Sequence, residues 1–392
     1  MNSLENLNLK GKKVLLRVDY NVPIQDNKIT DTHRIDMTLD TINLILNKNI
    51  DKLFIVSHRG RPNGKYVKEM DLSLVHKYLS SVVREKILFI PGVISKGNIE
   101  YGEKIILFDN IRFNPEEESK TVNCDVISFR KYLTSLCDIY VNEAFGCCHR
   151  KHSSIVGVNA EIKSPGLLIE SEIHYLQNLF QDKGDVLKTA IIGGSKVSDK
   201  IKLLNNIISK VNYLIIGGGM AFTFLKYFGH EIGKSLFDED GYKLVPEIIK
   251  NAELHKTEII FPIDFICNNK FENTGDVIYK DLKDGIPPNY MGLDIGSETV
   301  KKFKSVLFKS QRIIWNGPLG VFEFENFSNG SRQIMEYLAN FSATTIIGGG
   351  DTAACCMKFN CHKKMNWVST GGGASLTMIE GGKLPGIDFL YK

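Results

Sequence analysis

AIIGGSK (residues 190–196) is the first of four short apolar segments in the second half of the chain that end in glycine clusters. The others are LIIGGGM (residues 214–220), TIIGGGD (residues 345–351) and VSTGGGA (residues 368–374). An apolar, β-branched segment that stops at glycines and continues as a helix is typical of a buried parallel strand. Glycines let the backbone approach a ligand closely, and the free N–H groups of a helix start bind anions. Four such turns along one sheet edge predict a site for a polyphosphate nucleotide.

The composition is that of a globular protein with more than one domain. A chain of 392 residues exceeds one ordinary core, so we expect two domains. Its net charge of +4 is too small to argue for nucleic acid or a membrane surface as a partner. The sequence has no bilayer-spanning apolar segment, and its N-terminal segment lacks the apolar core of a signal peptide. We therefore expect a cytoplasmic protein with no nucleic-acid or membrane partner.

The eight cysteines are interpreted as free thiols. Cys147 and Cys148 are adjacent, as are Cys355 and Cys356, and adjacent cysteines do not normally bridge. Cys356, Cys361 and His362 lie close enough in sequence to suggest a metal site, but no second pair of ligands stands at a suitable distance.

Strands and helices alternate through both halves of the chain. Strand-like segments at residues 14–23, 52–58 and 137–146 are separated by helical patterns, one of which starts near Asp31. Such alternation predicts α/β lobes built on parallel sheets that are covered on both faces. A long helical pattern with a Pro–Gly start, at residues 164–182, separates the halves. We expect an N-terminal lobe at residues 1–165, a connecting helix at 166–182 and a C-terminal lobe at 183–380.

Cationic side chains follow the strands of the first half, where open α/β sheets bind ligands. Arg34, Arg61, Arg112 and Arg150 each come just after a strand or near a helix start. The guanidinium fork binds carboxylates and phosphates in bidentate fashion, so this set predicts a site for a small polyanion. Arg17 and Arg59, taken singly, are interpreted as surface arginines. One lobe for a small polyanion and one for a nucleotide suggest phosphoryl transfer between them.

These motifs, in their order along nearly the whole chain, resemble those of phosphoglycerate kinases. They include RVDYNVP, ITDTHRI, SHRGRP, FDNIRFNPEEE, VNEAFGCCHRKHSS, IIGGSKVSDKI, LIIGGGMAFTFL, IIWNGPLGVFE, IIGGGDTAA and VSTGGGASLTMIEGGKLPG. The resemblance implies two Rossmann-like lobes of similar size, joined by a long helix, with a cleft between them. It also implies a monomer and a tail, residues 381–392, that returns to the N-terminal lobe.

The resemblance also implies a site residue by residue. The phosphoglycerate ligands would be Asp19, Asn21, Arg34, His58, Arg61, Arg112 and Arg150. The residues around ADP or ATP would be Gly194, Ser195, Lys196, Lys200, Gly217, Gly218, Gly292, Leu293, Asn316, Pro318, Glu323, Gly349, Gly350, Asp351 and Thr352. The cofactor would be Mg²⁺, which Asp351 would contact on the nucleotide.

The implied reaction is the reversible transfer of the acyl phosphate of 1,3-bisphosphoglycerate to MgADP, giving 3-phosphoglycerate and MgATP in glycolysis. A carboxylate leaving group is a weak base, so catalysis depends on alignment and charge neutralisation rather than on a general base. The resemblance assigns that work to Arg34, Lys196 and the N–H groups around Gly349 and Gly372. Since the two ligands bind different lobes, domain closure must bring them together.

The chain departs from the usual family residues at a few positions. Ser195 replaces alanine, Tyr290 replaces tryptophan, Arg59 replaces a small or aliphatic residue, Glu143 replaces aspartate, and Cys147 and Cys148 replace small residues. Nucleotide preference is left open by Ser195 and Tyr290.

Two other classes of function fit the sequence less well. A dinucleotide-dependent oxidoreductase would carry G-x-G-x-x-G, which the glycine spacing here does not match, and no P-loop kinase motif is present. A non-catalytic nucleotide-binding scaffold would have lost Arg34, Lys196 or Asp351, and all three are present.

Overall fold

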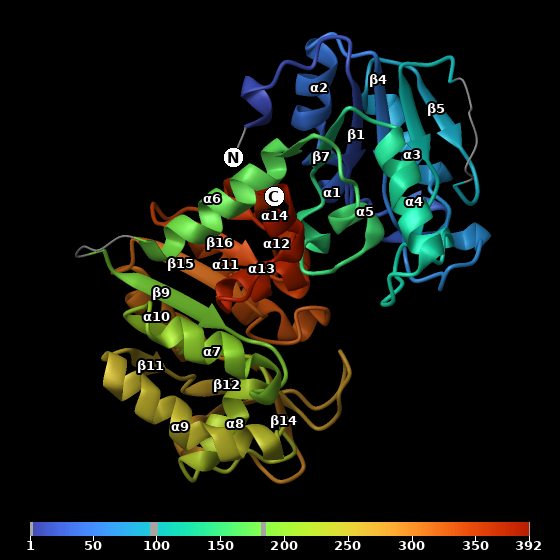
Figure 1. Cartoon of the computed structure of the whole chain (residues 1–392). Helices are drawn as coiled ribbons and strands as arrows, with labels where there is room; N and C mark the ends of the chain where they lie inside the picture. Colours follow the sequence, from blue (N-terminus) through green and yellow to red (C-terminus); the bar gives the residue numbers. More distant parts are fainter. Residues whose placement is uncertain (1–2, 95–100, 182–185, 392) are drawn as a thin grey trace. The chain divides into compact units, whose positions relative to one another are not determined.

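The computed structural model describes residues 3–94, 101–181 and 186–391 and divides the chain into two compact units. Unit 1 contains Met1–His174 and Lys383–Lys392, and unit 2 contains Tyr175–Gly382. The division falls inside helix α6 (Leu167–Gln181), which is the long green helix of Figure 1. The connecting helix expected from residue 166 starts at Leu167, and Ser164 and Pro165, which the helical pattern included, end strand β8 (Ile162–Pro165). Asp182, the expected helix end, lies outside the described residues.

Unit 1 is built on a six-stranded sheet in which every neighbouring pair is parallel. The strand order is β5-β6-β4-β1-β7-β8. The bounds of the strands other than β8 are Lys13–Arg17 for β1, Lys52–Val56 for β4, Ile87–Ile90 for β5, Ile105–Phe108 for β6 and Ile139–Asn142 for β7. β1 lies in the middle of the sheet, between β4 and β7, so its carboxyl end has neighbours on both sides.

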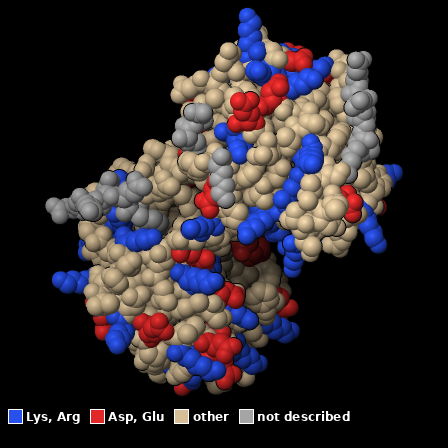
Figure 2. All heavy atoms as spheres, viewed as in Figure 1, with Lys and Arg blue, Asp and Glu red and all other residues tan. Residues whose placement is uncertain are grey.

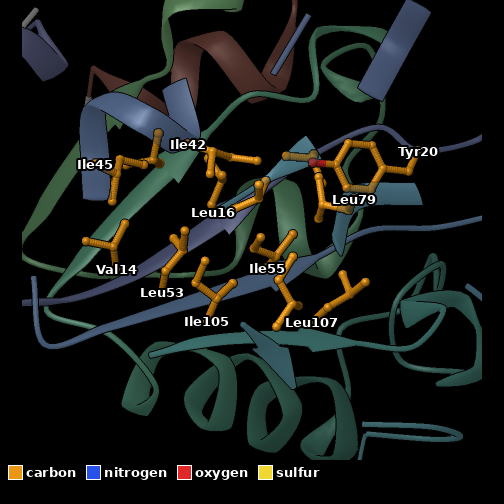
Figure 3. Packing of buried hydrophobic residues seen from close by; sticks show 14 of the residues in the cluster. Val14, Leu16, Tyr20, Ile42, Ile45, Leu53, Ile55, Leu79, Ile105 and Leu107 are labelled. Atoms are coloured by element: carbon orange, nitrogen blue, oxygen red, sulfur yellow. The ribbon is translucent and has the colours of Figure 1, made fainter. Parts of the chain in front are cut away.

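The two faces of this sheet carry two separate hydrophobic clusters. Val14 and Leu16 of β1 pack with residues of α2 (Leu39–Asn47) and α3 (Ser73–Val82) in the cluster of Figure 3. Leu15, which lies between them, packs with residues of α4 (Cys124–Ser135) on the opposite face. Side chains alternate across a strand, so burial of both sets requires helices on both faces. The strands therefore read as continuous apolar segments.

Unit 2 has a second six-stranded parallel sheet with the order β11-β10-β9-β15-β16-β17. The bounds are Lys188–Ile192 for β9, Tyr213–Ile216 for β10, Glu258–Ile260 for β11, Arg312–Asn316 for β15, Thr344–Gly348 for β16 and Trp367–Val368 for β17. In chain order within the sheet this is 3-2-1-4-5-6, the Rossmann order, and the order reverses between β9 and β15. The sequence-based expectation of two Rossmann-like α/β regions is confirmed.

The expectation of unbroken β–α alternation in the second half is wrong over residues 264–295. A three-stranded antiparallel sheet lies there, formed by β12 (Asp264–Asn268), β13 (Ile278–Asp281) and β14 (Met291–Ile295). Phe265 and Cys267 of β12 are buried against Phe222, while Tyr279 of β13 is half exposed. One apolar face is enough for an antiparallel sheet, which needs no crossover helix.

The remaining helices connect or cover the strands. A single helix was expected from near Asp31, but Thr38 separates two helices there, and its hydroxyl donates to the carbonyl oxygen of Ile35. The bounds are His33–Asp36 for α1, Ser153–Val156 for α5, Ile201–Ile208 for α7, Met220–Tyr227 for α8, Glu239–His255 for α9, Ser297–Leu307 for α10, Asn329–Leu338 for α11, Gly350–Lys358 for α12, Gly373–Ile379 for α13 and Pro385–Leu390 for α14. A two-residue hairpin pairs β2 (Ile24–Gln25) with β3 (Lys28–Ile29).

The C-terminal helix α14 packs on unit 1, against α5 and β8. The backbone N–H of Gly386 donates to the carbonyl oxygen of Cys148 at 2.9 Å. The ring of Phe389 lies edge-on to Tyr140, 6.3 Å between centroids, and Leu390 is buried in the cluster around Leu15. Tyr391 remains 59% exposed, so it adds little burial.

Leu390→Ala should lower the free energy of unfolding by about 2 to 3 kcal/mol, because it removes a buried side chain and leaves a cavity. Tyr391→Ala should change it by less than about 0.5 kcal/mol, as expected for an exposed position. Urea unfolding followed by fluorescence checks both. Equal effects of the two substitutions would contradict the packing of α14.

Candidate functional site

The carboxyl ends of β1 and β4 bring Asp19 and His58 together in unit 1. The parallel register pairs Arg17 with Val56, and Asp19 and His58 each lie two residues beyond that pair. A carboxylate oxygen of Asp19 lies 3.8 Å from Nδ1 of His58. These two residues are far apart in sequence, and it is the strand pairing that makes them neighbours.

Arg34 and Asn21 complete the inner part of this site. Arg34 donates to the Asp19 carboxylate at 3.2 Å and to the carbonyl oxygen of Asn21 at 3.3 Å. The side-chain oxygen of Asn21 accepts the N–H of Gly60 at 3.0 Å, which ties the turn after β1 to the turn after β4. Burial alone would raise the pKa of Asp19, but the guanidinium groups of Arg34 and Arg17 help to hold it below its ordinary value. Asp19 is therefore an ionised anchor for the cations around it.

The other expected phosphoglycerate ligands lie around this core. Arg112, in the turn after β6, is 4% exposed and donates to the carbonyl oxygen of Gly60 at 2.7 Å, and it pairs with Glu118 at 3.1 Å. Arg150 donates to the ring of His149 at 3.1 Å, and Arg61 is exposed. Burial and then the neighbouring arginines lower the pKa of His152 to about 3. Direct contacts or a shared partner thus link five of the expected ligands: Asp19, Asn21, Arg34, His58 and Arg112. Arg61 and Arg150 are more exposed than Arg112.

Arg17 is fully buried, so its interpretation as a surface arginine is wrong. Its Nε donates to the hydroxyl of Ser154 at 2.8 Å, and that hydroxyl donates to the buried carboxylate of Glu117 at 2.6 Å. Burial by itself would lower the pKa of Arg17, but Cys147, Glu117 and Asp19 raise it. The sequence did not reveal this network, because Glu117 and Ser154 meet Arg17 only in the folded sheet. Arg59 instead donates to the carbonyl oxygens of Glu69 and Asp71.

Asp19, His58 and Cys147 form the one cluster of three possible metal ligands that the described residues contain. The guanidinium of Arg17 lies 3.4 Å from Nδ1 of His58 and 3.7 Å from the sulfur of Cys147, and Arg34 is paired with Asp19. A metal ion would have to displace these arginines. Because fixed cations already occupy the donor atoms, the site suits an anion and not a metal.

In unit 2 the expected nucleotide residues gather where the strand order reverses. The N–H of Gly193, after β9, donates to the carbonyl oxygen of Asn316, at the end of β15, at 2.9 Å. Gly349 directly precedes α12 and has φ +88°, and a β-carbon there would come within 2.7 Å of the Asn316 amide. Only glycine adopts that backbone and fits that space. Open α/β sheets bind ligands at this position.

A cavity of about 470 Å³ opens at this edge. Its lining includes eight residues expected from the sequence: Gly194, Ser195, Gly218, Gly292, Leu293, Pro318, Glu323 and Asp351. Volumes of this size suit drug-sized or nucleoside-sized ligands. Gly217 lies at the end of β10, beside Gly218.

The remaining expected nucleotide residues form a polar network beside the cavity. Lys200 donates to the side-chain oxygen of Asn316, whose amide donates to the carbonyl oxygen of Gly348 at 3.0 Å. The hydroxyl of Thr352 accepts the N–H of Gly317 at 2.6 Å. Burial lowers the pKa of Lys200, an effect that the Asp351 carboxylate opposes. Lys196 is exposed, Gly350 is the first residue of α12, and Gly372, with φ +49°, precedes α13.

The cavity lining also contains residues that the sequence analysis missed, among them four large apolar side chains. Phe222 comes from α8, Phe265 and Met291 come from the antiparallel sheet, and Phe271 comes from the segment between β12 and β13. Phe222 follows the glycines of LIIGGGM and could have been suspected from its place in that turn. The other three lie on the antiparallel sheet and its loop, which the alternating pattern did not reveal.

Two of the departures from the usual family residues have structural roles here. The buried carboxylate of Glu143 accepts the N–H groups of Leu168 and Ile169 and the hydroxyl of Thr41, so it caps the start of α6. Burial raises the pKa of Glu143 to about 8 in spite of these hydrogen bonds. Tyr290 packs against the cluster around Phe222 and donates its hydroxyl to Asp276.

Charged side chains of both signs are mixed on the face of the molecule that Figure 2 shows. Within the described ranges, none of the helices has the length and apolar character needed to cross a membrane. All eight cysteines are free, as the sequence predicted.

Comparison with known proteins identifies the family. The family model for phosphoglycerate kinase matches residues 4–382. The chain belongs to the phosphoglycerate kinase family. The phosphoglycerate kinase of Drosophila melanogaster is 42% identical over 98% of this chain and 97% of its own length, and phosphoglycerate kinase 1 of Homo sapiens is 41% identical over 99% and 98%.

Solved structures agree with this assignment. The phosphoglycerate kinase of Coxiella burnetii superposes with a TM-score of 0.86 at 36% identity, covering 99% of this chain and 98% of that one. The enzyme of Pyrococcus horikoshii gives 0.82 at 28% identity, covering 100% and 98%. Phosphoglycerate kinases are phosphotransferases of glycolysis that use a nucleotide substrate, and the chain is a kinase of this family. The alternative function of a dinucleotide-dependent oxidoreductase is thereby excluded.

His58 should stay neutral down to acidic pH in the folded protein. Burial holds the pKa of His58 well below its ordinary value of 6.5; Asp19 opposes this, and Arg17, Arg112 and Arg34 add to it. Its ring signals in NMR spectra should therefore show no titration between pH 8 and pH 5.5. In urea-unfolded protein the same residue should titrate near pH 6.5, since nothing buries it there.

The difference in the pKa of His58 between the folded and unfolded chain makes the free energy of unfolding depend on pH. Below about pH 6.5 the unfolded chain takes up a proton at His58 that the folded chain does not, so its contribution to the free energy of unfolding falls as the pH falls. A midpoint near 6.5 in the folded protein would contradict the burial of His58 among arginines.

Proposed function

We propose that this chain catalyses the reversible transfer of the acyl phosphate of 1,3-bisphosphoglycerate to MgADP, with 3-phosphoglycerate bound by unit 1 and the nucleotide bound by unit 2. The observation that carries this proposal is that the sheet edges of the two units have different chemical character. Unit 1 collects Arg34, Arg112 and His58 around Asp19, and unit 2 opens a cavity of about 470 Å³ at its switch point. The first suits a small polyanion and the second suits a nucleoside.

The phosphoglycerate ligands in this proposal are Asp19, Asn21, Arg34, His58, Arg61, Arg112 and Arg150. Arg34 carries 31% side-chain exposure while it remains paired with Asp19, so its guanidinium is oriented and still open to a ligand. Arg112 is fixed by Gly60 and Glu118. Because these cations are already oriented, binding an anion requires little further reorientation of their side chains.

The nucleotide ligands fall into an apolar group and a polar group. The apolar group, which includes Gly218, Leu293 and Pro318, lines the cavity and is suited to the base, with Glu323 at the ribose. The polar group, which includes Lys200, Asn316 and the N–H groups at the start of α12, is suited to the phosphates. Arg34, Lys196 and the N–H groups around Gly349 and Gly372 would neutralise the phosphoryl group during transfer. A carboxylate leaves in this reaction, so no general base is assigned.

Asp351 fits the role of the magnesium contact. Its carboxylate is exposed in the first turn of α12, it lines the cavity, and its oxygens accept no hydrogen bond from another described residue. Carboxylate oxygens are the ligands that Mg²⁺ prefers, and the ion when bound neutralises charge on the nucleotide phosphates. We assign Asp351 to hold it.

The chain is proposed to act as a cytoplasmic monomer. Both of its substrates are small, water-soluble metabolites, and each proposed half-site is complete within one unit of a single chain. Sedimentation of the purified protein tests the oligomeric state.

Arg34→Ala should lower kcat by at least ~10²-fold, as for the loss of one strong transition-state donor, with little change in nucleotide affinity. The measurement is a coupled assay for ATP formation from 1,3-bisphosphoglycerate and ADP, which also tests the proposed function itself in the unmodified chain. Arg59→Ala is the matched control, since Arg59 bonds only backbone carbonyl oxygens. An Arg34→Ala protein with nearly full turnover would refute the role of this residue.

Asp351→Asn should weaken MgADP binding by about tenfold or more, because a charged oxygen ligand is replaced by a neutral one. Binding of 3-phosphoglycerate should be unchanged, since Asp351 belongs to unit 2 and the proposed phosphoglycerate ligands belong to unit 1. Isothermal calorimetry with each ligand in turn separates the two effects. Equal loss of both affinities would indicate misfolding instead.

Transfer should require movement of the units toward one another, because the two proposed ligand sets belong to different units. Reacting atoms must come within about 3 to 3.5 Å of each other, which neither unit can achieve alone. Small-angle X-ray scattering should show the radius of gyration falling most when both ligands are present. A ternary complex no more compact than the free protein would argue against closure.

A further inference from the structure

The two ring nitrogens of His58 lie in different surroundings. The side chain is 4% exposed, and Nδ1 faces the Arg17 guanidinium at 3.4 Å, the Cys147 sulfur at 3.8 Å and the Asp19 carboxylate at 3.8 Å. Nε2 makes no hydrogen bond to any other residue that the structure describes. A polar nitrogen without a protein partner at a ligand site is available to the ligand.

Arg17 restricts which nitrogen of His58 carries the proton. A guanidinium has five N–H donors and no acceptor, so it can meet Nδ1 favourably only if Nδ1 presents its lone pair. A proton on Nδ1 would point at the hydrogens of the guanidinium. In neutral histidine a bare Nδ1 places the proton on Nε2.

The guanidinium of Arg17 is itself held in place. Its Nε donates to Ser154 at 2.8 Å, and another nitrogen donates to the carbonyl oxygen of Val18. Ser154 in turn holds the buried carboxylate of Glu117, through its hydroxyl at 2.6 Å and its N–H at 2.9 Å. The group facing His58 is therefore fixed by bonds on its other sides, and its charge is balanced by Glu117 behind it.

Asp19 is the group that could oppose this arrangement, because a carboxylate would attract a proton to Nδ1. Its distance of 3.8 Å from Nδ1 is too long for a hydrogen bond. One of its oxygens accepts from Arg34 at 3.2 Å, and the other accepts from the N–H of Asn21 at 3.1 Å. Each of its oxygens thus already accepts from a donor other than His58.

We propose that Arg17 is a positioning residue that holds His58 as the neutral Nε2–H tautomer, so that this N–H is donated to an oxygen of the phosphoglycerate ligand. The second half of the proposal rests on the proposed function, since it needs that ligand in unit 1. The first half is a property of the free protein. Arg17 would act on the ligand through His58 without touching it.

Cys147 offers a matched control. Its sulfur contacts both Nδ1 of His58 and the guanidinium of Arg17, at 3.8 and 3.7 Å. Sulfur is a weak hydrogen-bonding partner and the thiol carries no fixed charge. Removing it should therefore leave the tautomer in place, whereas removing Arg17 should not.

The direct test is a long-range ¹H–¹⁵N correlation spectrum of the unmodified, ligand-free protein labelled with ¹⁵N-histidine. The signals of His58 are identified by their loss in His58→Gln. The expected pattern at pH 7 is that of a protonated Nε2 and a bare Nδ1. A protonated Nδ1, or an imidazolium, would overturn the proposal.

Two variants separate positioning from general structural damage. Arg17→Gln offers an amide that can both donate and accept, so it should release the tautomer and weaken 3-phosphoglycerate binding by about tenfold or more, with MgADP binding unchanged. Cys147→Ala should retain the Nε2–H tautomer and bind 3-phosphoglycerate within about twofold of the unmodified chain, a difference well under the ~10-fold that one such bond contributes. If Arg17→Gln fails to fold, the spectrum of the unmodified protein still decides. An Arg17→Gln protein that folds and keeps both the tautomer and the affinity would overturn the role of Arg17.

A pair of substitutions at His58 tests donation to the ligand. The amide nitrogen of Gln can occupy the region of Nε2, and that of Asn the region of Nδ1. Calorimetry with 3-phosphoglycerate should show His58→Gln binding about tenfold more tightly than His58→Asn, the effect of one hydrogen bond to a charged group. Equal affinities would overturn donation from Nε2. If the unmodified chain bound no 3-phosphoglycerate, the proposed function and the ligand half would fail together, while the spectrum would still decide the tautomer.

Discussion

Parallel strand pairing is the constraint on which both candidate half-sites depend. When every strand of a sheet runs in one direction, all the carboxyl ends reach the same edge, and every crossover must return along a face. In unit 1 this brings the turns after β1 and β4 together, so that Asp19 and His58 become neighbours. In unit 2 it brings the glycines after β9 next to those after β15. Neither set would meet in an antiparallel sheet, where consecutive strand ends lie at opposite edges.

Buried charge gives the edge of unit 1 its chemical character. A fully buried guanidinium is costly unless acceptors and a counter-charge accompany it, and Arg17 has Ser154, the carbonyl oxygen of Val18 and the carboxylate of Glu117. Burial, with added effects of Arg17, Arg112 and Arg34, lowers the pKa of His58 and keeps it uncharged, while Arg34 and Arg17 help to keep Asp19 ionised. The result is a fixed arrangement of hydrogen-bond donors that is suited to binding an anion. A metal ion would find the same donor atoms already taken by cations.

Backbone geometry plays the corresponding part in unit 2. The positive φ of Gly349 turns the chain from β16 into α12, and the absence of a side chain lets Asn316 approach. Lys200, Asn316 and Thr352 then tie the ends of the neighbouring strands together. The antiparallel sheet β12–β14 adds apolar side chains to the cavity that the parallel sheet alone would not supply. The phosphate-binding groups and the apolar wall thus come from two different kinds of sheet.

The sequence by itself determined what depends on neighbouring residues along the chain. Apolar segments that end in glycines, such as residues 190–196 and 345–351, revealed the parallel strands and helix starts, because period and turn chemistry are local. The motifs in their family order also indicated the reaction. Only the tertiary structure decided which side chains meet across the fold. The burial of Arg17, the capping of α6 by Glu143 and the entry of Phe265 into the cavity each join segments that are far apart in sequence. Their partners are selected by strand order and packing, which no local pattern records.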